Sequence, residues 1–343
     1  NDVDLMLFDK VIAFDNLRQK IVLITNIRTN DLKTNYEAAS ATLKDMADLI
    51  IKGTPHLPPA GRFAGPATPL FNEQQFCDIV ERAKEYIREG DIFQVVLSNR
   101  LEAPYRGSLL NAYRVLRTIN PSPYLFYFTS NDIELTGASP ETLAKLQDGT
   151  LYSFPLAGTR PRGKTPAEDA ELEEGLLKDE KELAEHNMLV DLGRNDVGKV
   201  CEFGSVTVDR FHEVLKFSHV MHIGSEVSGT LRKDKDALDA IDAVLPAGTL
   251  SGAPKLRAAE IINEMENDKR GIYGGAIGYL SFTGNMDTCI AIRLAFAKNG
   301  KVYVRSGAGI VADSAPETEF HETINKAKAM MSALEIAEKD EAL

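Results

Sequence analysis

The chain has 343 residues, a formal net charge of −12 and a hydrophobic content of 43%. This length predicts two domains or one large one, with ample apolar residues for a core. The acidic balance argues against a general nucleic-acid binder, which would normally carry a basic face.

The cysteines and the termini restrict the protein class further. Cys77, Cys201 and Cys289 are far apart and form no CxxC pair. This spacing argues against a zinc site and against a disulfide framework, and it fits a reducing cytoplasm. No apolar run reaches the roughly 18 residues of a membrane span, and no signal peptide is visible. Because the chain starts Asn1-Asp2 without Met, we expect a fragment of a longer protein.

The N-terminal part predicts a hairpin followed by a helix. Residues 11–14 and 21–24 are apolar runs separated by a turn at Asp15-Asn16, which indicates two strands. Residues 34–51 predict a helix. The segment 53–69, rich in Pro and Gly, predicts a linker or a domain boundary.

Downstream, short strands alternate with helices. Apolar residues from Phe76 to Ile87 share one face of a predicted helix that Gly90 ends. Strands are predicted over residues 93–97, 124–128, 142–146, 151–154, 220–227, 276–282, 289–296 and 302–304. Residues 179–192 predict another helix. The last helix has an apolar face of Phe320, Ile324, Ala327, Met331 and Leu334. Several links are short hairpins, which favours an α+β fold over a doubly wound parallel sheet.

Two pairs of glutamates have the spacing of one helix face. Glu182 and Glu185 are three residues apart, as are Glu319 and Glu322. Four carboxylates on facing helices would form a site of hard oxygen ligands, which Mg²⁺ prefers. The alternative is that both pairs are solvated helix faces, because ExxE is a weak pattern.

Three further motifs have alternative interpretations. Leu156-Ala-Gly-Thr-Arg-Pro-Arg-Gly163 offers donors for a carboxylate, or is an ordinary surface loop. Ser306-Gly-Ala-Gly-Ile310 could hold an anion with backbone amides, but by itself predicts a turn. His219 and His222 would point to opposite faces of a strand, which disfavours joint metal binding.

Taken together, the motifs resemble those of the chorismate-utilising enzymes over residues 71–337. They occur in the order of that family: Ile92-Phe-Gln-Val-Val-Leu-Ser98, Gly137-Ala-Ser-Pro-Glu141, Leu156-Ala-Gly-Thr159, Lys181-Glu-Leu-Ala-Glu-His186, Val220-Met-His222, Tyr273-Gly-Gly275, Ile292-Arg293, Gly307-Ala-Gly309 and Glu319-Phe-His-Glu322. The resemblance implies a four-layer α/β/β/α core with packed antiparallel-rich sheets. Residues 1–60 would be a remnant of an N-terminal regulatory region, and residues 70–338 the chorismate-binding catalytic domain.

The resemblance also implies roles for individual residues. Glu141 would be the general acid on the departing 4-hydroxyl of chorismate, and His222 would assist the later loss of pyruvate. Protonating a poor leaving group requires a carboxyl with a raised pKa, which burial would supply. The residues implied to hold chorismate are Gly158, Thr159, Tyr273, Arg293, Gly307, Ala308 and Gly309.

A metal cofactor is implied as well. Glu185 and Glu322 would bind Mg²⁺, with Glu182 and Glu319 in or near its shell, and the ion would hold the ring carboxylate. Because chorismate is a dianion, Mg²⁺ and Arg293 together would offset both of its charges.

Two positions indicate which nucleophile attacks the ring. Isochorismate and salicylate synthases of this family carry Lys where this chain has Gln94, and Gln cannot activate water as a base. Aminodeoxychorismate synthases often carry a Lys where this chain has Ala157. External ammonia remains, which implies anthranilate and pyruvate as products. The alternative is an aminodeoxyisochorismate or aminodeoxychorismate synthase of the same family.

The resemblance implies partners and an effector. The ammonia would come from a glutamine amidotransferase subunit, because this chain shows no Cys-His glutaminase signature. Pro123, Tyr124 and Leu125 resemble part of a tryptophan feedback pocket, although two prolines also explain a turn there. The other half of that pocket would precede this chain, so we expect insensitivity to tryptophan.

Overall fold

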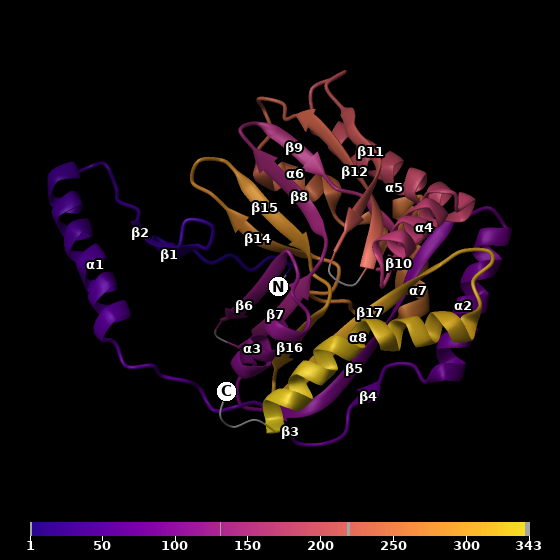
Figure 1. Ribbon diagram of the computed structural model, residues 1–343, viewed down its shortest axis with the longest axis horizontal. Coiled ribbons are helices and arrows are strands. Elements are labelled where there is room, and N and C mark those ends of the chain that lie inside the picture. Colours follow the sequence, from indigo (N-terminus) through magenta and orange to yellow (C-terminus); the bar gives the residue numbers. More distant parts are fainter. Residues whose placement is uncertain (1, 131, 218–219, 340–343) are drawn as a thin grey trace. The chain divides into compact units, whose positions relative to one another are not determined.

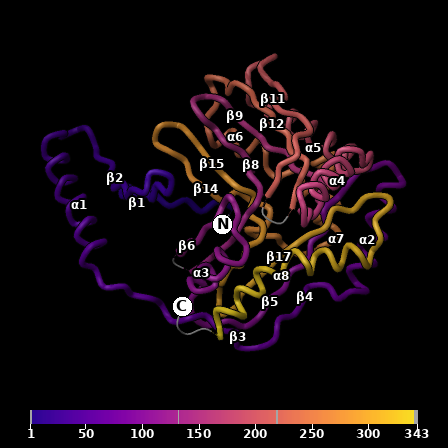
Figure 2. Tube along the Cα trace, in the orientation of Figure 1, coloured from indigo at the N-terminus to yellow at the C-terminus, as the bar shows by residue number. Residues whose placement is uncertain are grey.

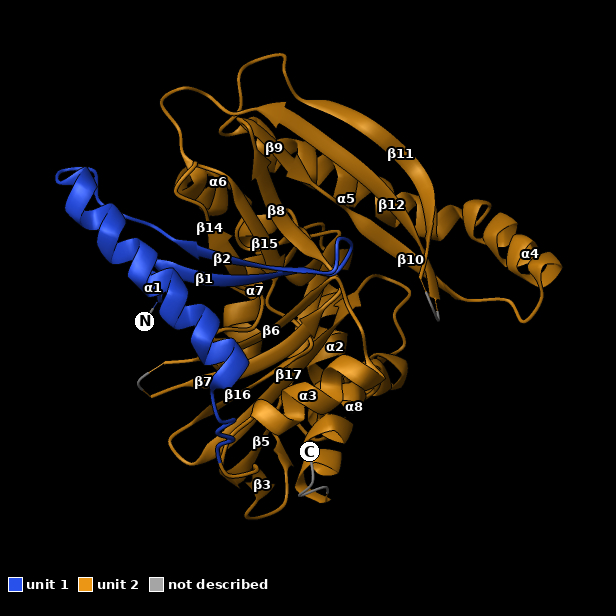
Figure 3. Ribbon diagram, turned by 60° about the vertical axis from the view of Figure 1, so that its left-hand side comes forward, with its two compact units in different colours: residues 1–58 blue, residues 59–343 orange. Residues whose placement is uncertain are grey.

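The computed structural model describes residues 2–130, 132–217 and 220–339, so that His219 lies outside the described residues. The chain forms two compact units, residues 1–58 and residues 59–343 (Figure 3). Among the described residues, each helix is too short or too polar to span a bilayer.

The first unit consists of one hairpin and one helix. β1 (Lys10–Asp15) and β2 (Lys20–Thr25) pair antiparallel, which confirms the hairpin predicted from the two apolar runs. The Asp31 side chain caps α1 (Leu32–Lys52) by accepting from the backbone N–H of Thr34. None of the described residues of this unit is buried, so the unit has no core of its own. An extended segment leads from α1 toward β3 (Figure 2).

The second unit contains two large sheets in which the paired strands run antiparallel. The seven-stranded sheet, called sheet I, has the order β10-β12-β9-β8-β15-β14, with β11 also paired to β12. Its strands are β8 (Thr142–Gln147), β9 (Thr150–Ser153), β10 (Leu156–Pro161), β11 (Thr207–Lys216), β12 (Val220–Thr230), β14 (Ala276–Leu280) and β15 (Met286–Ile290).

The eight-stranded sheet, called sheet II, has the order β13-β5-β17-β16-β7-β6, and the short strands β3 and β4 also pair with β5. Its strands are β3 (Arg62–Phe63), β4 (Thr68–Pro69), β5 (Gln94–Arg106), β6 (Tyr124–Thr129), β7 (Glu134–Ser139), β13 (Gly252–Ala253), β16 (Leu294–Lys298) and β17 (Lys301–Ile310).

Helices cover the two sheets from outside (Figure 1). Those on sheet I are α4 (Pro166–Leu177), α5 (Glu180–Gly198) and α6 (Ala237–Val244). Those on sheet II are α2 (Glu73–Arg88), α3 (Leu110–Ile119), α7 (Lys255–Glu266) and α8 (Pro316–Lys339). Between the sheets, Phe126 of β6 packs with Cys289 of β15 and Leu294 of β16. The layers therefore run helix, sheet, sheet, helix, which confirms the predicted α+β fold.

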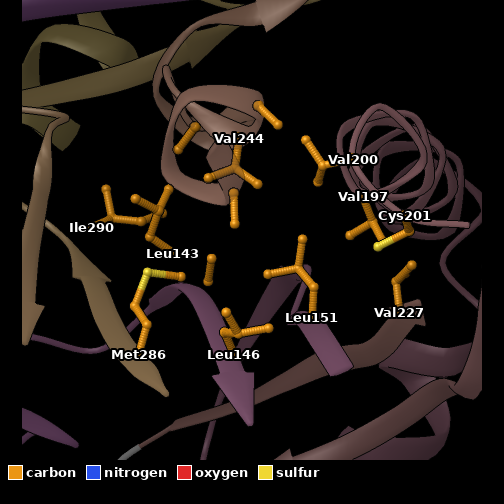
Figure 4. Packing of buried hydrophobic residues seen from close by; sticks show 14 of the residues in the cluster. Leu143, Leu146, Leu151, Val197, Val200, Cys201, Val227, Val244, Met286 and Ile290 are labelled. Carbon is orange, nitrogen blue, oxygen red and sulfur yellow. The ribbon is translucent and has the colours of Figure 1, made fainter. Parts of the chain in front are cut away.

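A large apolar cluster fixes α5 and α6 on sheet I. Leu143 and Leu146 of β8 and Leu151 of β9 meet Val197 of α5 and Val244 of α6, and all five are buried (Figure 4). Burying such a side chain stabilises the fold by about 1.5–3 kcal/mol relative to leaving it exposed. The cluster holds α5 at a fixed position on the strands that follow Glu141.

Some predicted elements differ from the structure. Residues 289–296, predicted as one strand, are split between β15 in sheet I and β16 in sheet II, and the chain crosses between the sheets at Arg293, whose φ is +53°. The residues on both sides of the break are apolar, and the single Arg293 within the run does not by itself indicate a crossing. Residues 306–310 form the end of β17 rather than a turn. Residues 156–161, for which the sequence left two interpretations open, form β10.

The apolar face predicted for the last helix is partly wrong. Ile324 is 46% exposed, whereas Thr323, Met330 and Ala333 are buried. The Thr323 hydroxyl donates to the Phe320 carbonyl, so this polar group is satisfied inside the helix and can face the core. The segment predicted as a linker, residues 53–69, also contributes β3 and β4 to sheet II.

Candidate active site

Glu141 lies where the chain crosses from β7 of sheet II to β8 of sheet I. Its backbone carbonyl accepts from Ile290 N at 3.0 Å, and its backbone N–H donates to Ser139 Oγ at 3.4 Å. Thr249 Oγ1 donates to Glu141 Oε1 at 3.0 Å. Burial raises the pKa of Glu141 to about 7, although the Thr249 hydrogen bond and the charge of Lys326 both lower it. A carboxyl with that pKa can donate a proton near neutral pH.

Arg293 occupies the second crossing, between β15 and β16. The two crossings lie side by side, because Ala138 N donates to Arg293 O at 3.1 Å. Arg293 Nη1 donates to the backbone carbonyl of Lys326 at 2.8 Å, which ties the guanidinium to α8. Burial lowers the pKa of Arg293, while Tyr273 and Glu322 raise it, and an arginine stays charged under such conditions.

Two glycines of β17 leave room beside polar side chains. A Cβ on Gly307 would lie 2.8 Å from the Tyr273 hydroxyl oxygen, and one on Gly309 would lie 2.7 Å from Gln94 Nε2. Lys326 Nζ donates to Gly307 O at 3.0 Å. These positions therefore need glycine because polar groups approach the strand closely.

Tyr273 and Ala308 differ in how they could contribute. Tyr273 is buried, and burial raises its pKa to about 12, so its phenol stays a neutral donor. The Ala308 side chain lies in the core cluster with Ile261, so that only its backbone could reach a ligand. Sequence reasoning predicted both as substrate-binding residues without separating these roles.

His222 faces β10 across the strand pair of β10 and β12. Its Nδ1 lies 2.9 Å from Gly158 O and 3.1 Å from Thr159 Oγ1. A carbonyl oxygen only accepts, so the hydrogen bond to Gly158 places a proton on Nδ1 and leaves Nε2 as the basic nitrogen of the neutral ring. Gly158 has a φ of +64° at a bulge of β10, which turns its carbonyl toward the ring.

The two predicted metal ligands, Glu185 and Glu322, and the two glutamates predicted beside them lie on α5 and α8. Burial raises the pKa of Glu185, and the charges of Glu182 and Glu322 raise it further. Burial and the charge of Glu322 also raise the pKa of Glu319, against a hydrogen bond from Ser314. Such shifts arise when carboxylates share a site without enough positive charge.

The carboxylates are nevertheless not arranged as a finished metal site. Arg160 pairs with Glu182 at 3.3 Å, and Lys326 forms an ion pair with Glu322. Within the described ranges, no three His, Cys, Asp or Glu side chains converge closely enough to hold a metal ion. The donor set itself fits a hard cation, because it offers oxygen ligands in a partly buried, mutually repelling group.

Lys326 and Thr249 are site residues that sequence reasoning missed. Lys326 lies one helical turn after Glu322 on α8, so the i, i+4 spacing was a signal available in the sequence. Thr249 lies in the short helix η1 (Gly248–Leu250) and reaches Glu141 across 108 residues of sequence. No local pattern could have indicated that contact.

The predicted effector residues lie at the start of β6. Pro123 is exposed, Leu125 packs toward the helices on sheet II, and Tyr124 reaches sheet I with its hydroxyl. The structure therefore separates these three side chains. Their predicted role in binding an effector stays a prediction.

A half-buried acid with a raised pKa on one sheet crossing, Arg293 on the neighbouring crossing and Lys326 close enough to affect that acid are typical of an enzyme that acts on small anions. Residues 1–332 match the family of chorismate binding enzymes, and the chain belongs to that family. It is 50% identical over 345 residues to anthranilate synthase component 1 of Aquifex aeolicus (strain VF5), covering 99% of this chain and 70% of that protein.

Solved structures agree with this placement. The anthranilate synthase component I from Streptococcus pneumoniae TIGR4 superposes with a TM-score of 0.84 at 43% identity, covering 94% of this chain and 72% of that one. The menaquinone-specific isochorismate synthase from Escherichia coli superposes with a TM-score of 0.77 at 23% identity, covering 92% and 72% of the two chains. The second likeness concerns the fold alone.

Proposed function

We propose that this chain is the chorismate-converting component of an anthranilate synthase, a lyase that forms anthranilate and pyruvate from chorismate and ammonia in tryptophan biosynthesis. Gln94 is the residue that favours ammonia over water as the nucleophile. Its Oε1 is buried and has no hydrogen-bond partner among the described residues, while its Nε2 donates to Glu185 at 3.4 Å. A neutral amide oxygen can accept an N–H from ammonia but cannot deprotonate water. The relatives named above support the same reaction.

The first step would be the addition of ammonia to the ring. The ammonia lone pair forms a bond to C2, the ring double bonds shift, and the C4–O bond breaks. Glu141 donates its proton to the departing oxygen, so that water leaves. The ammonium group formed on C2 releases one proton to solvent, and Glu141 takes one up before the next turnover. Arg293 and Lys326 would offset the negative charge of the substrate carboxylates in a site that excludes water.

The second step would remove the enolpyruvyl group. Nε2 of His222 takes the proton from C2, the bond between the ring and the enolpyruvyl oxygen breaks, and enolpyruvate leaves as the ring becomes aromatic. A proton then returns to the methylene carbon of enolpyruvate, which gives pyruvate and leaves His222 neutral again. The hydrogen bond from Nδ1 to Gly158 holds the ring in the tautomer that this step needs. The two steps together convert chorismate and ammonia into anthranilate, pyruvate and water without another reactant.

Magnesium is proposed as the cofactor. Glu185 and Glu322 would hold it, with Glu182 and Glu319 beside them. When bound, it would neutralise a substrate carboxylate. The raised pKa values of Glu185 and Glu319 support the proposal, because a nearby cation would favour their charged forms.

A glutamine amidotransferase subunit is the proposed source of ammonia. The designation of the relatives as component 1 supports a partner component. We also propose that the enzyme acts in the cytoplasm, where its free cysteines, Cys77, Cys201 and Cys289, would stay reduced.

The reaction is tested with chorismate, ammonium and Mg²⁺. We expect anthranilate, read by fluorescence, and an equal amount of pyruvate, read by a coupled dehydrogenase. An amino product without pyruvate would instead indicate an aminodeoxyisochorismate or aminodeoxychorismate synthase. No conversion of chorismate would contradict the proposal.

Metal removal tests the cofactor separately. Chelation with EDTA should abolish turnover, and added Mg²⁺ should restore it. Glu185→Gln should weaken Mn²⁺ binding measured by electron paramagnetic resonance, because an amide is a weaker ligand than a carboxylate. Glu171→Gln, at an exposed position of α4, is the matched control. Equal Mn²⁺ affinity in both variants would remove Glu185 from the proposed site.

A further inference from the structure

Tyr124 of β6 contacts both ends of the crossing, residues 139–142, that contains Glu141. Its backbone pairs with Ser139, the last residue of β7, where the crossing begins. Its side chain leaves sheet II and reaches Thr142, the first residue of β8, where the crossing ends. Glu141 lies between these two contacts.

The Tyr124 hydroxyl makes two hydrogen bonds to sheet I. It lies 2.7 Å from Asp287 Oδ1 of β15 and 2.8 Å from Thr142 Oγ1. A carboxylate only accepts, so Tyr124 donates to Asp287, and the Thr142 hydroxyl donates to the oxygen of Tyr124. Both contacts are partly buried, where such hydrogen bonds are costly to break.

The backbone of the crossing has anchors of its own. Ile290 N donates to Glu141 O at 3.0 Å, and Ser139 Oγ donates to Ile290 O at 2.7 Å. These bonds fix the crossing against β15, but they involve only Ser139 and the Glu141 backbone. The Tyr124 hydroxyl adds the only described hydrogen bond of a β6 side chain to the Thr142 end.

We propose that Tyr124 is a positioning residue for the reaction, because its backbone holds the Ser139 end of the crossing and its hydroxyl holds the Thr142 end, which together fix the carboxyl of Glu141. The proposal rests on the proposed function through the role of Glu141 as general acid. Reacting groups must be held closely, since a displacement of about 1 Å can lower the rate roughly a hundredfold. Without the Tyr124 hydroxyl, the Asp287 carboxylate and the Thr142 hydroxyl would form hydrogen bonds to water instead.

Tyr124→Phe is the first test, with Tyr127→Phe as its matched control. Tyr127 lies on the same strand, and its hydroxyl bonds to Glu134 and Ser108 on the side of sheet II, without a described bond to sheet I. We expect Tyr124→Phe to lower kcat about tenfold or more while KM for chorismate changes less than twofold. Tyr127→Phe should keep kcat within twofold of the parent. Tryptophan is left out of all assays, so that the predicted effector role of residues 123–125 does not enter.

The pH profile of kcat/KM tests whether loss of the Tyr124 hydroxyl changes the surroundings of Glu141. Glu141 must be protonated to donate, so kcat/KM should fall above its pKa. If the crossing opens to water, burial decreases and the alkaline limb moves to lower pH in Tyr124→Phe. The charged groups near Glu141 are Lys326 of α8 and Asp196 of α5, which borders the same small cavity, and neither is altered. Tyr127→Phe should leave the limb in place.

Thr142→Val and the double variant complete the test. If Tyr124 acts through Thr142, the double variant should lose no more activity than the more damaging single variant. Thermal unfolding checks that each variant is folded. The proposal is overturned if folded Tyr124→Phe keeps kcat within twofold, if its alkaline limb stays in place, or if Tyr127→Phe loses as much. Because the parent enzyme and Tyr127→Phe report the ammonia-dependent reaction independently, failure of the proposed function would be seen separately.

Discussion

Burial sets the acidity of Glu141. Its carboxyl has one described hydrogen bond, from Thr249, and a pKa raised to about 7. The unfolded chain would bind this proton only below its ordinary pKa of 4.5. The folded state therefore binds more protons than the unfolded state between those values, so this group lowers stability as pH rises through that window. The proposed role of Glu141 as an acid requires surroundings that raise its pKa. Once the carboxyl is deprotonated, the same surroundings lower the free energy of unfolding.

Glu141→Gln should therefore separate stability from activity. We expect turnover to be lost, because an amide cannot protonate the leaving oxygen. We also expect the free energy of unfolding, relative to the parent, to rise by up to about 3 kcal/mol between pH 4.5 and pH 8. Denaturant unfolding at both pH values measures this difference, with Glu171→Gln as the control. The same pH dependence in parent and variant would show that the surroundings of Glu141 do not raise its pKa.

At the scale of elements, the bulge of β10 determines the position of His222. Gly158 combines a φ of +64° with close contacts, since an added Cβ would lie 3.0 Å from Leu176 Cδ1 and 3.3 Å from Glu182 Oε2. Its carbonyl is the acceptor of the His222 Nδ1 hydrogen bond. Backbone conformation, helix packing and the orientation of the histidine are thus coupled at one residue.

Gly158→Ala should lower both stability and turnover. Gly149→Ala is the matched control, because Gly149 has a φ of +82° in the turn between β8 and β9 with nothing within 4 Å of an added Cβ. Backbone strain alone should cost each variant about 1–3 kcal/mol of unfolding free energy. Only Gly158→Ala should also lose kcat, through displacement of His222. Equal kcat values in the two variants would mean that the bulge does not position the histidine.

At the scale of the whole molecule, the two units differ in how much they bury. The second unit contains all five described apolar clusters, whereas the first exposes large residues such as Phe8, Phe14 and Ile51. A unit without buried residues has little to oppose local unfolding. All proposed site residues belong to the second unit.

Limited proteolysis should reflect this difference. We expect cleavage first within residues 1–58, leaving a resistant fragment that begins near residue 59. The cleaved protein should keep its ammonia-dependent turnover, because its site is intact. Mass spectrometry of the time course, together with the fluorescence assay, measures both. First cleavage inside residues 70–338 would contradict the assignment of the stable core.

Local signals in the sequence were enough to predict part of the fold. The hairpin at residues 11–24, α1, α2, α5 and the existence of α8 follow from apolar periodicity and caps, and the ordered motifs indicated the family. The folded structure decided that residues 289–296 cross between two sheets and that Thr249 reaches Glu141. It also decided that Tyr124 joins Thr142. The reason is physical: periodicity records which face of an element is buried, but not which distant element covers it, and the pKa of Glu141 depends on that cover.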